Sequence, residues 1–400
     1  MINRLQPRRT LRIPAAALAL TALLAGCGTA RLSASSAGTA GVTGSAAQAR
    51  GARAALPGIG PVPAHFAARS VTFVSPDEGF VLGTAPCAVH PCTSLVRTLN
   101  RGAAWAGLPA PLAKLGFPGD TNAVWGIRFA NPTHGFIFGS SLWETTDGGE
   151  HWVRDASPFN SIISLAIVHG QVIAVTEHCT RTSGCPRTGW IVRRGLAGGP
   201  WTTPIRIRPA FPESPTDLIG TQAGVAAILN GTSALVSHDG GFHWTSHPTP
   251  CTSISKGLPG SVAVIAPRGL ALLCIGQGFT GHTLKFTYRS LDNGAHWTTA
   301  GKPNAAGDGG TVAAANRKQW LISTASAASW LYYSGEEGFG WHTAAFRGDG
   351  GLGWADLGFT TLTNGIVVYG PARSDGNQEN FPGQLWLTNN GGQTWHAVTF

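Results

Sequence analysis

Short apolar runs alternate with glycine-rich polar turns from about residue 65 to the end of the 400-residue chain. The run 71–73 followed by 79–83 matches the run 127–129 followed by 135–139 without a gap. Further copies of this pair of runs occur at 165–175, 218–229, 262–274, 312–323 and 357–368. Runs of this length, rich in β-branched and aromatic residues and bounded by turn residues, predict β-strands.

A polar octapeptide, Ser/Thr-x-Asp-x-Gly-x-x-Trp, follows each pair of runs. It is intact at Thr145–Trp152, Ser237–Trp244 and Ser290–Trp297, has Asn for Asp at Thr98–Trp105 and Thr388–Trp395, has Glu at Ser334–Trp341, and keeps only glycine and tryptophan at Arg194–Trp201. The seven tryptophans lie 43 to 54 residues apart. Each period holds two runs, a third run into the octapeptide and a fourth that opens on Trp. The sequence therefore predicts an all-β fold, a seven-bladed β-propeller of four-stranded antiparallel blades over residues 63–400.

The octapeptide suits a hairpin turn between the third and fourth strands. Asp or Asn at its third position can accept backbone N–H bonds as an Asx-turn, and Gly supplies a positive φ. The tryptophan can then pack beside the turn. His151, His243 and His296 directly precede three of these tryptophans, and we interpret them as structural.

These octapeptides resemble the Asp-box (BNR-like) repeats shared by sialidases, xyloglucanases, sortilin-type receptors and photosystem II assembly propellers. The resemblance covers about residues 65–400. It implies the propeller fold, and it implies that the box is a structural turn that lies away from the active face. It does not by itself indicate a function.

The N-terminus has the pattern of an export signal. Arg4, Arg8 and Arg9 precede an apolar stretch, 13–25, that is too short to span a bilayer. The stretch ends in Leu24-Ala25-Gly26-Cys27, which resembles a bacterial lipobox. We therefore expect a lipoprotein signal peptide over 1–26, a lipidated Cys27, and an exported protein that is lipid-anchored at the outer face of the cytoplasmic membrane or in the cell envelope.

Residues 27–62 form a second segment, rich in Ala, Gly and Ser, whose composition predicts a flexible tether. The formal net charge of +9 comes mostly from these first two segments, since seven of the 28 basic residues and none of the 19 acidic residues lie before residue 61. The remaining chain is nearly neutral, which argues against a nucleic-acid partner. We expect a monomer.

In a propeller of this phase, the connections from the second to the third strand and from the fourth strand to the next blade share one face, which we call the loop face. The seven octapeptides lie on the opposite face, the turn face. All six cysteines beyond Cys27 fall on the loop face, and Cys274 is expected to end a second strand. Their even number in an exported chain predicts the disulfides 87–92, 179–185 and 251–274, from Cys87, Cys92, Cys179, Cys185, Cys251 and Cys274. Their spacing does not fit a metal site, and we expect no cofactor.

The loop face also carries the candidate binding residues. They lie in the longest loops and in a recurring Gly-Asp pair before the inner strands: Glu177, His178, Arg181, Arg187, His282, Arg373, Asp375, Glu379, Asp120, Asp308 and Asp349. We expect a protein or carbohydrate ligand, with rigid blades presenting these loops. Solvated loops and turn-capping aspartates are the alternative interpretation of the same residues.

Two functions fit this arrangement. The first is a membrane-tethered extracytoplasmic recognition or assembly module, without catalytic residues. The second is a glycoside hydrolase of the sialidase or xyloglucanase type, in which a pair such as Asp120 and Asp349 acts as an inverting acid and base at a separation of roughly 6.5–9.5 Å. The sialidase pattern is incomplete, because the Arg-Ile-Pro motif at Arg12 lies in the signal segment and only Tyr369 could approach the loop face. The sequence therefore favours binding over catalysis.

Overall fold

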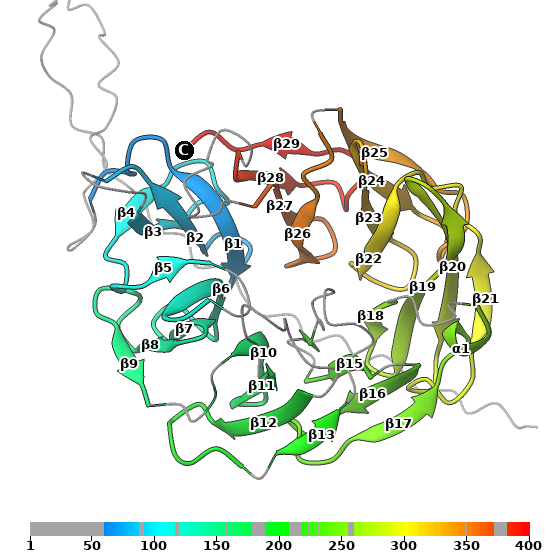
Figure 1. The fold of residues 1–400 in the computed structure, drawn as a ribbon, viewed down its shortest axis with the longest axis horizontal. Coiled ribbons are helices and arrows are strands. Elements are labelled where there is room, and N and C mark those ends of the chain that lie inside the picture. The colour runs from blue at the N-terminus through cyan, green and yellow to red at the C-terminus, as the bar shows by residue number, and fades with distance from the viewer. Residues whose placement is uncertain are drawn as a thin grey trace, which may run out of the picture. The chain divides into compact units, whose positions relative to one another are not determined.

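The computed structural model describes residues 60–87, 92–116, 120–156, 159, 161–177, 189–202, 204–207, 218–221, 224–230, 232–254, 260–348, 350–371 and 382–400. These residues, within a compact unit of residues 55–400, form seven β-sheets arranged as a ring (Figure 1). The predicted seven-bladed β-propeller is confirmed. Among the described residues, no helix is long and apolar enough to cross a membrane.

The first four blades follow one another in chain order. Blade one contains β1 (Ala67–Phe73), β2 (Gly79–Ala85), β3 (Cys92–Thr98) and β4 (Ala106–Leu108). Blade two contains β5 (Lys114–Leu115), β6 (Ala123–Phe129), β7 (Gly135–Gly139), β8 (Leu142–Thr145) and β9 (Val153–Asp155). Blade three contains β10 (Ile162–Val168), β11 (Gln171–Glu177), β12 (Gly189–Gly195) and β13 (Ile205–Ile207). Blade four contains β14 (Ile219–Gly220), β15 (Ala226–Asn230), β16 (Ser233–Ser237) and β17 (Thr245–Pro248).

The remaining three blades complete the ring after the short helix α1 (Cys251–Ile254). Blade five contains β18 (Ser261–Ala266), β19 (Gly269–Phe279), β20 (His282–Ser290) and β21 (Thr298–Gly301). Blade six contains β22 (Asp308–Ala314), β23 (Trp320–Ala325), β24 (Ser329–Ser334) and β25 (His342–Arg347). Blade seven contains β26 (Trp354–Phe359), β27 (Gly365–Tyr369), β28 (Gln384–Thr388) and β29 (His396–Ala397). Neighbouring strands are antiparallel except β5, which runs parallel to β6 as an extra strand of blade two.

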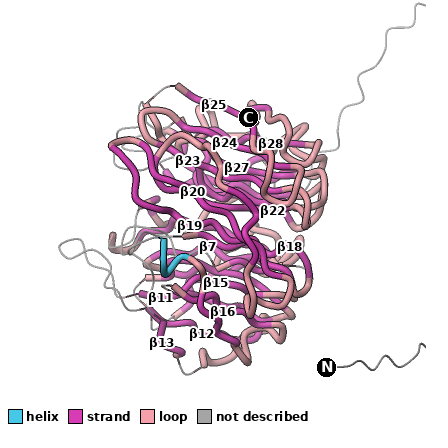
Figure 2. Tube along the Cα trace, turned by 90° about the vertical axis from the view of Figure 1, so that its right-hand side faces the viewer, coloured by secondary structure: helices cyan, strands magenta, loops and turns pink. Residues whose placement is uncertain are grey.

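The burial of each strand follows its place in the blade. Every residue of β2, β7 and β27 is buried, because a second strand is covered on both faces by the neighbouring blades. Such strands are continuous apolar runs rather than alternating ones. The outer strands are short and mostly exposed, as in β9 and β17. The core is thus a series of layers between adjacent blades. Figure 2 shows the same strands from the side of the ring.

The octapeptide turns have the geometry that their residues predict. In blade two, the Thr145 hydroxyl donates to Asp147 Oδ1 at 2.8 Å and accepts the Gly149 amide at 3.0 Å. Gly149 has φ 93°. Blade one makes the same bonds with Asn100 in place of the aspartate, because only an oxygen acceptor is required there.

The three histidines of these turns are structural, as expected. Each donates its backbone N–H to one oxygen of the turn aspartate, and its Nδ1 lies 2.6–2.7 Å from the other. For Asp147 and Asp239, burial alone would raise the pKa, but the hydrogen bonds from His151 and His243 outweigh it and lower each pKa to about 2. In Asp292 the hydrogen bonds from His296 dominate, and its pKa is also well below the usual range.

Blade three departs from the repeat at Arg194, which stands where the other blades have Ser or Thr. Its side chain, 7% exposed, crosses to blade two and binds Glu144 at 2.6 Å and Asp155 at 2.8 Å. Burial raises the pKa of Asp155, and the Arg194 guanidinium opposes that shift. His134 completes the network at 2.7 Å from Glu144. An ion-pair network between blades therefore replaces the local turn bonds.

The ring closes by packing between blades one and seven. Phe66 packs edge-on against Phe400 within a core cluster that contains residues of both blades. On the inner strands, Asp356 of β26 accepts hydrogen bonds from the Ser70 hydroxyl at 2.5 Å and the Val71 amide at 2.8 Å. Arg128 of blade two reaches the same carboxylate at 3.0 Å. Asp356 has a positive φ of 51°, and these three bonds hold it in that conformation.

Candidate functional site

Two of the predicted disulfides are present on the loop face. Cys87 is bonded to Cys92 in the β2–β3 connection, and Cys251 of α1 is bonded to Cys274 of β19. The third predicted pair, Cys179 with Cys185, lies outside the described residues. Disulfides persist in oxidising compartments, so the two bonds indicate an extracytoplasmic protein.

Blade five presents a long hairpin where the sequence suggested a loop. Cys274 does not end the second strand, because β19 continues to Phe279 and pairs with β20 through Phe279–His282. A bulge between Ile275 and Gly278 allows the extension. Gly278 is needed there, since a Cβ at this position would lie 1.9 Å from the His282 carbonyl oxygen. The hairpin ends in Phe279, whose side chain is 86% exposed.

A buried lysine fixes the base of this hairpin. Lys285 of β20 donates to the carbonyl oxygens of Thr283 at 2.8 Å, Ala305 at 3.1 Å and Gly307. Burial lowers the pKa of Lys285 to about 8, although the negative charge of Asp308 acts to raise it. The ammonium group thereby ties the hairpin to the chain segment that leads into blade six.

Three of the predicted binding residues lie near the ends of described strands on the loop face. His282 begins β20, Asp308 begins β22, and both adjoin Gly307, which forms a parallel bridge with His282. His282 is partly exposed and Asp308 is exposed. The structure therefore brings His282 and Asp308 together. Asp120, before β6 in blade two, is also partly exposed.

Glu177 at the end of β11 is buried rather than displayed to solvent. Burial raises the pKa of this carboxyl to about 7, because a low-dielectric environment disfavours the ionised form. Its backbone amide donates to the Ser161 carbonyl at 3.0 Å, which anchors the strand end. A carboxyl with such a pKa can hold or release a proton near neutral pH.

The other predicted site residues fall outside the described residues: Cys27, His178, Arg181, Arg187, Asp349, Arg373, Asp375 and Glu379. The suggested pair of Asp120 and Asp349 is therefore not tested. Tyr369, the tyrosine that could approach the loop face, is fully buried and packs on Trp354 at 5.0 Å between ring centroids. Among the described residues there is no group of three or more side chains that could hold a metal ion.

Phe279 and Lys285 are the site residues that sequence reasoning missed. The Gly276-Gln277-Gly278 segment has the composition of a turn, which hid the strand extension. Lys285 alternates with apolar neighbours in β20 and would ordinarily face solvent. Its burial depends on backbone carbonyls 20 and 22 residues further along the chain, a contact with no local sequence signal.

No protein-family model matches the chain, and a search of curated proteins found no match. Among solved structures the chain is similar to a PL25 ulvan lyase bound to GlcA(1-4)Rha3S, at 11% identity over 86% of this chain and 97% of that one, with a TM-score of 0.50. It is similar to YCF48 bound to a D1 peptide, at 17% identity over 84% and 94%, with a TM-score of 0.49. A GH74 enzyme from Niastella koreensis, at 14% identity over 81% and 61%, gives a TM-score of 0.31. At these identities the likeness shows the propeller fold alone.

Proposed function

We propose that this chain is an exported recognition module, lipid-anchored at Cys27, that docks a protein partner on its loop face. The observation that carries the proposal is the β19–β20 hairpin with Phe279 at its tip. An aromatic side chain held out to solvent on a braced element is typical of the anchor residues of interfaces.

The bracing of the hairpin supports a binding role. The Cys251–Cys274 disulfide holds β19 to α1, and Lys285 holds β20 to the segment before blade six. A preorganised hairpin loses less conformational entropy when it binds. His282 and Asp308 lie beside the hairpin and add polar groups for recognition. Arg181 and Arg373, which the sequence assigns to loops of the same face, are included in the proposed surface.

The proposal is tested by purifying the tagged chain from membranes in three forms: wild type, Phe279→Ser and Phe339→Ser. Phe339 is a matched control, since it is 46% exposed but lies in the octapeptide of blade six on the turn face. We expect one partner protein to be recovered with wild type and Phe339→Ser, and at least about tenfold less of it with Phe279→Ser, as for an interface hot spot. Equal recovery from all three would reject the proposal.

The anchor is tested separately. We predict that Cys27→Ser moves the chain from the membrane fraction to the soluble extracytoplasmic fraction without changing its melting temperature, since the acyl chains attach outside the blades. If Cys27→Ser remains in the membrane fraction, the lipid anchor is wrong.

Glu177 is the observation that supports a second candidate, glycan cleavage. A carboxyl with a pKa of about 7 has the property required of a general acid. Purified Cys27→Ser protein should be incubated with xyloglucan, sialyllactose and a uronate-containing polysaccharide. Release of products that Glu177→Gln abolishes would establish the enzyme, and no release from any of the three would leave the recognition module as the function.

A further inference from the structure

Two arginines at equivalent positions of different blades, Arg97 and Arg193, have different partners: a carboxylate for Arg97 and a neutral amide for Arg193. Arg97 in β3 and Arg193 in β12 each stand one residue before the first octapeptide position. Arg97 pairs with Glu78 at 2.5 Å, and both side chains are largely buried. In blade one, Gly79 pairs with Thr98, the first octapeptide position, and Glu78 precedes Gly79. In blade three, Val172 pairs with Arg194, the first octapeptide position, and Gln171 precedes Val172. Gln171 therefore stands where blade one has Glu78.

In blade three a neutral amide therefore replaces the carboxylate of blade one. Arg193 donates to Gln171 Oε1 at 3.1 Å, and within the described part of the chain no carboxylate lies at ion-pair distance from it. In blade five, Arg289 at the same position pairs with Glu337, which comes from the octapeptide turn of blade six. Among the described residues, Arg193 therefore has a neutral partner where Arg97 and Arg289 have a carboxylate.

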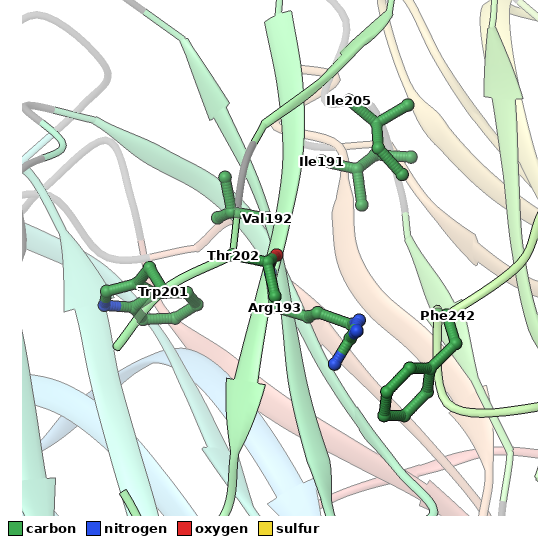
Figure 3. A pocket seen from close by; sticks show the side chains of 8 residues that line it. Ile191, Val192, Arg193, Trp201, Thr202, Ile205 and Phe242 are labelled. Atoms are coloured by element: carbon green, nitrogen blue, oxygen red, sulfur yellow. The ribbon is translucent and has the colours of Figure 1, made fainter. Parts of the chain in front are cut away.

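Arg193 lies in a groove of about 470 Å³ between blades three and four, and Figure 3 shows the side chains that line it. Its guanidinium is 3.4 Å from the ring centroid of Phe242. Phe242 is 50% exposed and Ile205, on the other wall, is 43% exposed. Phe242 belongs to the octapeptide of blade four, so the groove opens at the turn-face end of the blades and is separate from the loop-face site.

The lining selects the chemistry of the occupant. Arg193 and Thr202 contribute the polar side chains of the groove, and the Thr202 hydroxyl already accepts the Arg193 amide at 3.1 Å. An aliphatic side chain next to a carboxylate would pack against the exposed Phe242 and Ile205 while the carboxylate pairs with the guanidinium.

We propose that the Arg193 groove binds a short acidic peptide segment of a protein partner, in which a carboxylate pairs with Arg193 and a neighbouring aliphatic side chain packs against Phe242 and Ile205. The site goes beyond the loop-face function and does not depend on it. Blade one cannot bind such a segment, because Glu78 occupies the position of the incoming carboxylate.

The experiment uses the full-length Cys27→Ser chain and two blocked pentapeptides, one of alternating leucine and glutamate and the other with glutamine in place of glutamate. Binding is measured by calorimetry or NMR titration. We expect the acidic peptide to bind about tenfold more tightly than its amide analogue, with a difference that shrinks as salt rises. Equal affinity for the two peptides would overturn the proposal.

Two matched variants locate the site. Gln171→Glu rebuilds the blade-one pair and should remove the preference for the acidic peptide, whereas Glu78→Gln in blade one should leave it unchanged. Gln171→Glu is expected to fold, since the same pair exists in blade one, and its melting temperature checks this. An unchanged preference in Gln171→Glu, or displacement of the peptide by an acidic trisaccharide such as trigalacturonate, would contradict an acidic peptide at Arg193.

Discussion

The two faces of the ring are built on different principles. On the turn face, one octapeptide recurs in seven blades, and in six of them its hydroxyl residue makes hydrogen bonds within the turn. On the loop face a Gly-Asp pair recurs before only three of the inner strands, and the described connections are held by two disulfides and by Lys285. We infer from this difference that repeated hydrogen bonds within the turns form the ring. Contacts that occur once, between residues far apart in the chain, shape the surface that can recognise a partner.

Substitution of Arg194 in blade three should have the largest effect on stability. It tests how far the turn face depends on hydrogen bonds within each turn. Arg194→Met leaves Glu144 and Asp155 without their cation, and we expect a loss of about 3 kcal/mol in the free energy of unfolding. Thr98→Val at the same position in blade one should lose only about 1 kcal/mol. Chemical denaturation measures both.

A further substitution sharpens this result. Arg194→Thr restores the residue type of the other blades, yet it should be nearly as destabilising as Arg194→Met, because Glu144 and Asp155 still lack the guanidinium in the blade interface. If Arg194→Thr were as stable as wild type, the local turn bonds would be sufficient and the network between blades would be unimportant.

On the loop face, Lys285→Met should have the next largest effect. The substitution removes the hydrogen-bond donor of three backbone carbonyls, and we expect the free energy of unfolding to fall by about 2 kcal/mol. The loss is smaller than the cost of three unpaired acceptors, because burying the ammonium group is itself unfavourable. Lys302→Met is the control, since Lys302 is exposed, and it should change stability by less than about 0.5 kcal/mol. Equal effects would show that Lys285 does not fix the hairpin.

The two faces should also respond to pH with opposite sign. The lowered pKa values of Asp147 and Asp239 contribute stability that is present above about pH 4 and is lost as pH falls towards 2. The raised pKa of Glu177 contributes stability that is present below about pH 4.5 and is lost as pH rises through 7.

Melting temperatures from pH 2 to 8 check both signs. Glu177→Gln should flatten the profile between pH 4.5 and 7, and Asp147→Asn should flatten it below pH 4 while keeping the turn, as Asn100 does in blade one. A Glu177→Gln profile that still falls between pH 4.5 and 7 would show that another group controls this range.

The repeated parts of the fold could be predicted from the sequence because each blade repeats the same local chemistry. Apolar runs gave the inner strands, Gly102 and its equivalents gave the turns, and the even set of cysteines gave two disulfides that the structure contains.

The site was less predictable because its contacts join positions far apart in the chain. Arg194 in a degenerate octapeptide gave no indication that it would bind Glu144, 50 residues earlier. Gly278 indicated a turn, although its missing side chain allows the hairpin to continue. The neutral partner of Arg193 became visible only when strand register aligned Gln171 with Glu78.

Site-specific photo-crosslinking tests the central claim, that the loop face is the docking surface, most directly. A photoreactive phenylalanine analogue is placed at position 279 on the loop face or at position 339 on the turn face of the lipid-anchored protein, and irradiated in cells. We predict a discrete adduct with one partner protein from position 279 and none with that protein from position 339. An adduct from position 339 alone, a glycan adduct, or no adduct from position 279 would contradict the account.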